Sequence, residues 1–205
     1  MRNHLFILIL FLSIPLVMAH QPRFPVSDKD TFIQNPEISQ AFYAELKGTP
    51  EFYIVNETKP FALYVQLLVI NISDINKQFV VTITQDDKII AILDNSEANW
   101  TLFHEEFAND DYWNGPEYRG NATGGYTITV TNSDLKGKYV LVIGDKESFP
   151  LSEIVRTIGV LPELKIFMNK TPLLAYWNLS GFFILITLLI IAAIIYFIFR
   201  TRSKK

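Results

Sequence analysis

Two uncharged apolar runs, one near each end, constrain this 205-residue chain more than any other feature. The first covers residues 5–17 and the second residues 179–199. Between them lie about 155 residues of mixed polarity, which is enough for one domain with its own core. The two runs predict how the chain is organised, and the middle must supply the folded domain.

The N-terminal run has the length and flanks of a signal peptide. It is only about 13 residues long, too short to cross a hydrocarbon layer of about 30 Å. It follows Arg2 and leads to the small residue Ala19, as the sequence before a signal cleavage site does. We therefore expect residues 1–19 to be removed, leaving His20 first. An uncleaved signal anchor is the alternative.

The C-terminal run predicts a transmembrane helix. A helix of about 21 residues covers about 30 Å, and Tyr176 and Trp177 precede the run as interfacial aromatics do. We place the span at 176–199. The tail 200–205 carries four cations and no acid, which by the positive-inside rule puts it in the cytoplasm. The expected location is the cell membrane, crossed once, with the N-terminus outside.

Between these ends we expect an extracellular domain at 20–158 and a juxtamembrane stalk at 159–175. Apolar and polar residues alternate along the chain from about residue 52, for example at 61–69 and 126–130. About seven such segments, about ten residues apart, predict a mainly β fold. The expected architecture is a single antiparallel β-sandwich, jelly-roll or immunoglobulin-like.

Two segments have helical patterns instead. Asn35, Pro36 and Glu37 form a helix-start sequence, and the apolar residues up to Gly48 predict a short N-terminal helix. After Pro150, the apolar residues at 151–158 recur at helical spacing. That second helix either covers the sandwich or lies on a lipid surface.

Charge and composition narrow the class of function. All 21 acidic residues but only 13 of the 18 cations fall in residues 20–178, a net charge of −8. Nucleic-acid surfaces are basic, so we expect no nucleic-acid partner. The chain has no cysteine. It contains no phosphate-binding glycine loop and no G-x-S-x-G or H-E-x-x-H sequence, so we expect no enzyme.

Six Asn-x-Ser/Thr sequons occur, against about 1.5 expected by chance. This excess predicts N-glycosylation, although drift in an Asn-rich chain is an alternative origin. Asn178 lies too close to the predicted membrane to be modified. The predicted glycosylation sites are Asn56, Asn71, Asn99, Asn121 and Asn169.

Residues 99–119 combine two of the three tryptophans with a cluster of acids, and we expect a long binding loop there. One hypothesis is an aromatic platform for a glycan or a peptide. Its residues would be Trp100, Tyr112, Trp113 and Tyr118. A structural alternative is that Trp100, Phe103 and Phe107 close one end of the sandwich, with the acids as a solvated rim.

Metal binding is a further hypothesis for the same segment. Calcium takes hard oxygen ligands, and the candidate donors are Glu105, Glu106, Asn109, Asp110, Asp111 and Glu117. Copper takes imidazole nitrogen. Cleavage after Ala19 would free the amine of His20, and His104 is the other histidine of the mature chain. This pair resembles the histidine brace of copper-dependent polysaccharide oxygenases and their non-catalytic copper-binding relatives. Those proteins' disulfides and long motif blocks are missing here.

The segments 35–48 and 139–147 together resemble an uncharacterised family of single-pass surface proteins from uncultivated prokaryotes. The likeness covers nearly all of the predicted ectodomain and implies no known activity. The strand pattern is also similar to the pre-peptidase-type accessory domains of secreted enzymes.

The leading hypothesis is a non-enzymatic, membrane-anchored extracellular binding or structural domain. It would engage a glycan, a peptide or a partner protein through residues 99–119. The alternative is a cell-surface metal-binding protein, with copper at His20 and His104 or calcium at Asp110 and Asp111. We expect no other cofactor.

Overall fold

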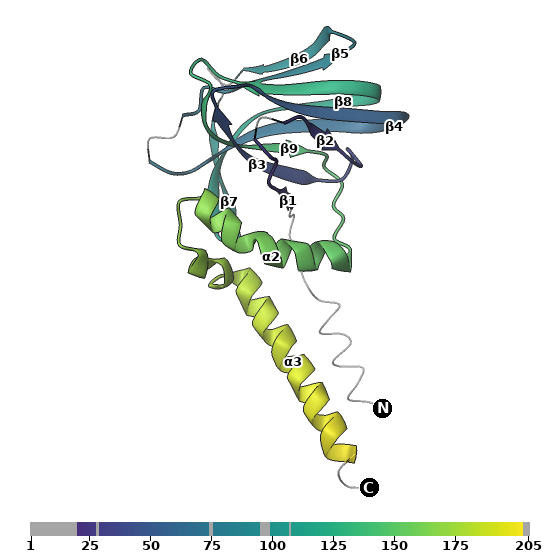
Figure 1. Cartoon of the computed structure of the whole chain (residues 1–205), viewed down its shortest axis with the longest axis vertical. Helices are drawn as coiled ribbons and strands as arrows, with labels where there is room; N and C mark the ends of the chain where they lie inside the picture. The colour runs from purple at the N-terminus through teal and green to yellow at the C-terminus, as the bar shows by residue number, and fades with distance from the viewer. Residues whose placement is uncertain (1–19, 28, 74–75, 95–98, 107, 203–205) are drawn as a thin grey trace.

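The computed structural model describes residues 20–202 except 28, 74–75, 95–98 and 107. The predicted signal peptide at 1–19 and Phe107 lie outside the described residues. Within the described residues, nine strands form one sheet, and three helices follow it in the chain (Figure 1). The strands are β1 (Gln21–Arg23), β2 (Thr31–Ile33), β3 (Gln40–Lys47), β4 (Glu51–Ile70), β5 (Val80–Gln85), β6 (Lys88–Asp94), β7 (Thr101–Glu105), β8 (Asp110–Thr131) and β9 (Lys136–Ile143). The helices are α2 (Leu151–Phe167), the 3₁₀ helix η1 (Pro172–Tyr176) and α3 (Leu179–Arg202).

The strands follow the order β1-β3-β9-β4-β8-β5-β6, with β2 beside β4 and β7 beside β8. The pairings are antiparallel except β1–β3 and β2–β4, which are parallel. The long strands β4 and β8 form the spine of the sheet. Two register shifts along this pair interrupt the ladder, and such irregularities bend a sheet. As a result β4 pairs with β2 along its first half and with β9 along its second half.

Alternating side chains of β4 build two cores. Leu63, Val65 and Leu67 lie in the larger cluster on the inner face of the sheet. Tyr64 and Leu68 point the other way, into a smaller cluster that includes Leu164 and Met168 from α2 and the residue just after it. The second half of β4 is therefore buried on both faces, because α2 covers the outer one (Figure 1).

The expectation of a mainly β fold is confirmed, but the expected N-terminal helix is wrong. Asn35 has a φ of 53°, which differs from the extended conformation of a helix N-cap. The helical stripe that we predicted belongs to β3, which pairs with β9 along its whole length. Apolar residues occupy nearly every position from 41 to 46 and cover both faces of this strand. Such a run also contains the spacing of a helical stripe by coincidence. The segment forms a strand because it pairs with β9.

Residues 101–105 and 110–114 form a hairpin and not a long loop, and residues 117–119 continue β8 beside β4. The strand β7 pairs with the first residues of β8, from Thr101 opposite Asn114 to Glu105 opposite Asp110. Asn109, in the turn between them, has a positive φ of 60°, which Asn tolerates better than most residues. The candidate residues of this segment therefore project to alternate faces of a sheet.

The predicted transmembrane helix at 176–199 also needs correction. Spanning a membrane takes about 20 consecutive apolar residues in one helix. Within the described part of the chain, no helix combines the length and the apolar character that crossing a membrane requires. The segment is also not one helix, because Tyr176 closes η1 and its hydroxyl donates to the carbonyl of Ile158 at 3.1 Å. The next helix, α3, begins at Leu179.

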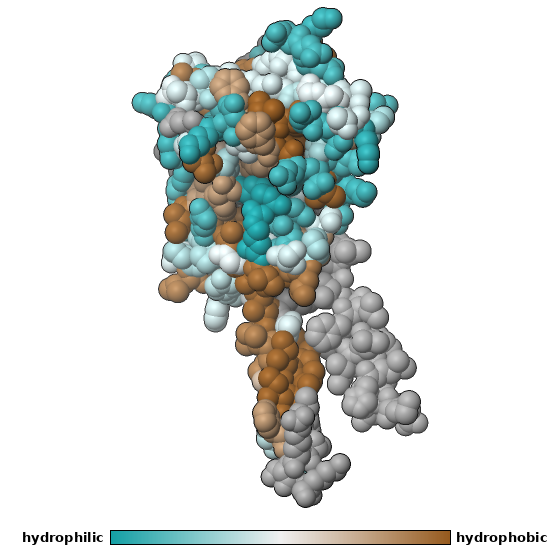
Figure 2. Space-filling view, turned by 45° about the vertical axis from the view of Figure 1, so that its right-hand side comes forward, coloured by the Kyte–Doolittle hydropathy of each residue, from teal (hydrophilic) through white to brown (hydrophobic). Residues whose placement is uncertain are grey.

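The part expected to be a stalk contains ordered helix. Residues 159–167 continue α2 through Pro162, and residues 172–176 form η1. Below these elements α3 carries apolar side chains on its surface (Figure 2).

Candidate functional site

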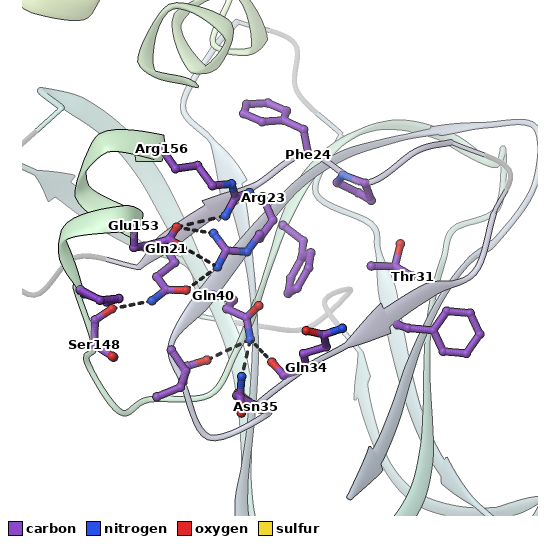
Figure 3. A pocket seen from close by; sticks show the side chains of 15 residues that line it. Gln21, Arg23, Phe24, Thr31, Gln34, Asn35, Gln40, Ser148, Glu153 and Arg156 are labelled. Atoms are coloured by element: carbon purple, nitrogen blue, oxygen red, sulfur yellow. Dashed lines mark hydrogen bonds and ion pairs between the residues drawn. The ribbon is translucent and has the colours of Figure 1, made fainter. Parts of the chain in front are cut away.

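An open pocket of about 470 Å³ lies where β1, β2 and the start of α2 meet (Figure 3). We call it the β1–α2 pocket. Ligand pockets commonly measure about 300–1,000 Å³, so this one can hold part of a small molecule or a few residues of a peptide. Its walls come from three separate parts of the sequence: residues 21–25, residues 31–42 and residues 148–156.

One wall is charged. The carboxylate of Glu153 accepts from two guanidinium groups, Arg23 Nη1 at 2.6 Å and Arg156 Nη1 at 3.0 Å. Both arginines also donate to the carbonyl of Pro22, at 3.0 and 3.3 Å. Two cations therefore surround one anion, and the group has one net positive charge.

The two arginines are held to different degrees. Arg23 also donates to the side chain of Gln21 and makes a second contact to Glu153 at 3.3 Å. Its side chain is 20% exposed, against 42% for Arg156. A guanidinium has five N–H donors, and the structure pairs two of those of Arg156 with acceptors among the described residues. Arg156 is thus the more accessible cation of the pocket.

Local structure fixes these charges in place. Glu153 lies in the first turn of α2, where the helix dipole favours a carboxylate. Arg156 follows three residues later, on the same side of the helix. The amide of Gln21, on β1, donates to the carbonyl of Ser148 at 2.5 Å and so ties the sheet edge to the segment before α2.

The opposite wall of the pocket is a backbone turn, which the buried side-chain amide of Gln40 holds in place. Gln40 is 6% exposed, and its Nε2 donates to the carbonyls of Gln34 at 3.0 Å and of Asn35 and Ile38 at 3.4 Å each. Aromatic side chains complete the lining. Phe42 is buried, whereas Phe32 is exposed at the pocket's edge.

The four aromatic residues of the predicted platform do not form one surface. Tyr112 is buried between the sheet and α2. Trp100 and Tyr118 are partly buried and pack against the larger core. Trp113 lies half-buried, with Lys77 Nζ 3.4 Å from its ring centroid and its Nε1 donating to Asn71 Oδ1 at 3.0 Å.

The histidines predicted to share a copper ion have separate partners. His20 Nδ1 is 2.5 Å from Ser39 Oγ beside β1, and burial lowers the pKa of its imidazole. His104, on β7, contacts Asp111 Oδ1 at 2.7 Å. In the part of the chain that the structure describes, no group of three or more His, Cys, Asp or Glu side chains could hold a metal ion.

Asp110, a predicted calcium ligand, is completely buried. Its Oδ2 accepts from Lys165 Nζ of α2 at 2.6 Å, and its Oδ1 accepts from Lys170 Nζ at 2.7 Å. Lys165 is itself 1% exposed and also donates to the carbonyl of Ala108 at 2.5 Å. The two oxygens of Asp110 thus join the hairpin to α2 and to the segment just after it, and a cation would have to displace these ion pairs.

The predicted glycosylation sites all lie at the surface. Each of these asparagines is exposed: Asn56, Asn71, Asn99, Asn121 and Asn169. The sixth sequon differs, because Asn178 Nδ2 donates to the carbonyls of Ala108 and Ala175 at 3.1 Å each. Nδ2, the atom that a glycan would modify, is thus engaged in hydrogen bonds at Asn178.

The pocket residues had no signal in the sequence. The strand β1 is three residues long, too short to show a period. Glu153 and Arg156 have the spacing of an ordinary exposed helix pair. Only the fold brings β1 beside the first turn of α2.

No protein-family profile matches the chain, and no curated protein matches it. Among solved structures, the pre-peptidase C-terminal domain of a collagenase from Bacillus anthracis is 14% identical, with a TM-score of 0.35. The match covers 57% of this chain and 96% of that domain. PliG from Aeromonas hydrophila, a periplasmic inhibitor of g-type lysozyme, is 11% identical, with a TM-score of 0.37 over 60% of this chain and 97% of that one. Likenesses this distant add no argument about function.

Proposed function

We propose that this chain is a binding domain and that its ligand site is the β1–α2 pocket. The ligand carries a carboxylate beside an apolar group, which is the chemistry at the C-terminal end of a peptide. One observation carries the proposal: Arg23 and Arg156 surround the single carboxylate of Glu153 at the mouth of a pocket with an aromatic wall.

The charge balance favours an anionic ligand. The pocket's ion group has one more cation than anion, in a domain whose overall charge is negative. A guanidinium binds a carboxylate through two parallel N–H donors. Arg156 can supply such a pair, while Arg23 stays bound to Glu153 and preserves the geometry.

The aromatic lining of the pocket determines which chemical group can lie beside the carboxylate of the ligand. Phe24, Phe32 and Phe42 line the same pocket. Apolar and aromatic surfaces supply most of the contact area in ligand pockets, and a few polar groups fix the orientation. A ligand with a carboxylate next to an aromatic or branched side chain would satisfy both walls.

We also propose that binding, without catalysis, is the activity, and that it takes place outside the cytoplasm. The signal-peptide pattern of residues 1–19 supports export. The exposed sequons support contact with a glycosylation system. The open pocket lacks a nucleophile paired with a general base among its lining residues, a pairing that covalent catalysis needs.

The test is a titration of the full chain, isotope-labelled for NMR, with N-acetylphenylalanine and with N-acetylphenylalaninamide. The two probes differ only at one end, where a neutral carboxamide replaces the carboxylate. We expect the acid, but not the amide, to shift resonances in residues 21–25 and 150–156. Equal shifts from both probes, or shifts elsewhere only, would contradict the proposal.

The matched variants are Arg156→Gln and Arg119→Gln. Arg119 is also exposed and forms two ion pairs, with Glu117 and Asp145, but it lies outside the pocket. We expect Arg156→Gln to weaken binding of the acid about tenfold, the value of one charge-assisted contact. Arg119→Gln should leave it unchanged.

The hairpin offers a second candidate surface, for a protein partner. Leu102 of β7 lies opposite Trp113 of β8, so their side chains share one face. Leu102 is 58% exposed, and Lys77 covers the ring of Trp113. An exposed apolar residue beside an aromatic and a cation is typical of contact surfaces. Loss of partner binding in Leu102→Asp, with the pocket titration unchanged, would assign partner binding to this face.

A further inference from the structure

Two tryptophan rings, those of Trp100 and Trp113, lie on one face of the hairpin. Trp113 is opposite Leu102, and opposed residues of antiparallel strands point to the same face. Trp100 lies two residues before Leu102, and its ring lies against Gly115, two residues after Trp113. We call these two rings and the space between them the Trp100–Trp113 site.

Local structure fixes the position of both rings. A Cβ at Gly115 would be 3.1 Å from Trp100 Cζ3, so the glycine provides the room that the ring of Trp100 needs. The same ring packs against the larger core. The indole of Trp113 is oriented by its Nε1, which donates to Asn71 Oδ1 at 3.0 Å. The two aromatic faces are therefore in place before any ligand arrives.

The ammonium group of Lys77 is the present occupant of this site. Its Nζ is 3.4 Å from the ring centroid of Trp113 and 5.5 Å from that of Trp100, and a cation within about 6 Å of an aromatic face is attracted to it. Among the described residues, no carboxylate forms an ion pair with Lys77. Burial lowers the pKa of this amino group, as loss of hydrating water does to an ammonium.

The chemistry of the site favours one class of cation. A lysine ammonium is compact and strongly hydrated, so it gives up much water to lie against a ring. A quaternary ammonium has no N–H group and holds water weakly, and aromatic faces are the surfaces that recognise it. The net charge of −8 on residues 20–178 also attracts cations in general.

We propose that the Trp100–Trp113 site binds an organic cation of the quaternary ammonium class, and that Lys77 occupies the site until the ligand displaces it. Lys77 lies in the irregular segment just before β5. Its long, flexible side chain can leave the rings without a change in the sheet. None of these three residues lines the β1–α2 pocket, so the site is separate from the one proposed above.

The test is an NMR titration of the full chain with choline and with 3,3-dimethylbutan-1-ol, which has the same shape but carbon in place of the charged nitrogen. The indole N–H resonances of the tryptophans are the readout. We expect choline to shift those of Trp100 and Trp113 to saturation, and the neutral alcohol to leave them in place. Trp177 is the internal control, because its side chain is 85% exposed and belongs to the segment after η1.

Two lysine variants test the displacement. Lys77→Ala and Lys88→Ala remove the same charge from exposed or half-exposed positions, but only the first empties the site. Lys77→Ala should tighten choline binding about fivefold, the factor that one exposed cation–π contact represents, and Lys88→Ala should leave it unchanged. Trp113→Leu should weaken choline binding at least tenfold.

Three results would overturn the proposal. The first is an equal response to choline and to the neutral alcohol. The second is the same choline affinity in Lys77→Ala and Lys88→Ala. The third is no saturable shift of Trp100 and Trp113 in either the native chain or Lys77→Ala. The lysine variants change only surface side chains, so these results do not depend on whether Trp113→Leu folds.

Discussion

At the scale of single residues, Asp110 is the most consequential side chain of the hairpin. A buried carboxylate is costly unless it is paired and hydrogen-bonded. Asp110 meets both conditions through Lys165 and Lys170. The sequence predicted that the acidic segment would bind a metal, but Asp110 instead neutralises Lys165, a buried residue of α2.

We predict that Asp110→Asn destabilises the protein by about 3–5 kcal/mol, because Lys165 would be left buried without its anionic partner. The measurement is urea denaturation followed by tryptophan fluorescence. Lys170→Ala is the comparison: its side chain is 36% exposed, and its loss should cost about 1 kcal/mol or less. Similar losses for both variants would show that the buried pair is not the stabilising element.

At the scale of elements, the turn at 34–39 forms one wall of the pocket and rests on the chain after β9. Ser39 N donates to the carbonyl of Lys146 at 3.0 Å, and Lys146 N donates to the carbonyl of Glu37 at 2.9 Å. Gly144 makes this approach feasible. It has a φ of 78°, and a Cβ there would lie 2.4 Å from the carbonyl oxygen of Ile38.

Gly144→Ala should therefore destabilise the fold by more than about 2 kcal/mol, through both strain and collision. Gly48→Ala is the matched control, since Gly48 also has a positive φ but nothing within 4 Å of an added Cβ. Gly48→Ala should lower the free energy of unfolding by about 1–2 kcal/mol, through backbone strain alone. The midpoints of thermal unfolding of the two variants give the comparison, and equal losses would rule out the collision.

The sequence predicted strands where apolar residues recur at every second position, as along 61–69 and 126–130. It failed at 41–46, because that apolar run fits a helical and a strand period at once and only pairing with β9 selects between them. The hairpin at 101–114 was missed since its acids and aromatics mask the alternation. The pocket was beyond prediction, because Arg23 and Glu153 are 130 residues apart and meet only after β1 pairs with β3.

At the scale of the whole molecule, buried tyrosines couple stability to pH. Tyr53 and Tyr139 are completely buried and share a hydroxyl hydrogen bond of 2.9 Å. Burial raises the pKa of both, and it also raises the pKa of Tyr43 and Tyr112, which pair at 3.3 Å. Ionisation is therefore easier in the unfolded chain than in the folded one.

A raised phenol pKa contributes stability that is complete below the ordinary value of about 10 and is lost as the pH rises above it. We predict a constant contribution from these tyrosines between pH 7 and 9 and a fall in the free energy of unfolding above about pH 10. Urea unfolding across pH 7–12 measures this. A Tyr139→Phe variant should start less stable and fall less steeply, and an identical slope would contradict the assignment.

Whether the β1–α2 pocket receives a carboxylate can be seen in a crystal structure of the full chain soaked with N-acetylphenylalanine. We expect density for the carboxylate within hydrogen-bonding distance of the Arg156 guanidinium and for the phenyl ring against the phenylalanine side chains of the pocket. Density for the probe at another site, with the pocket holding only water, would contradict it.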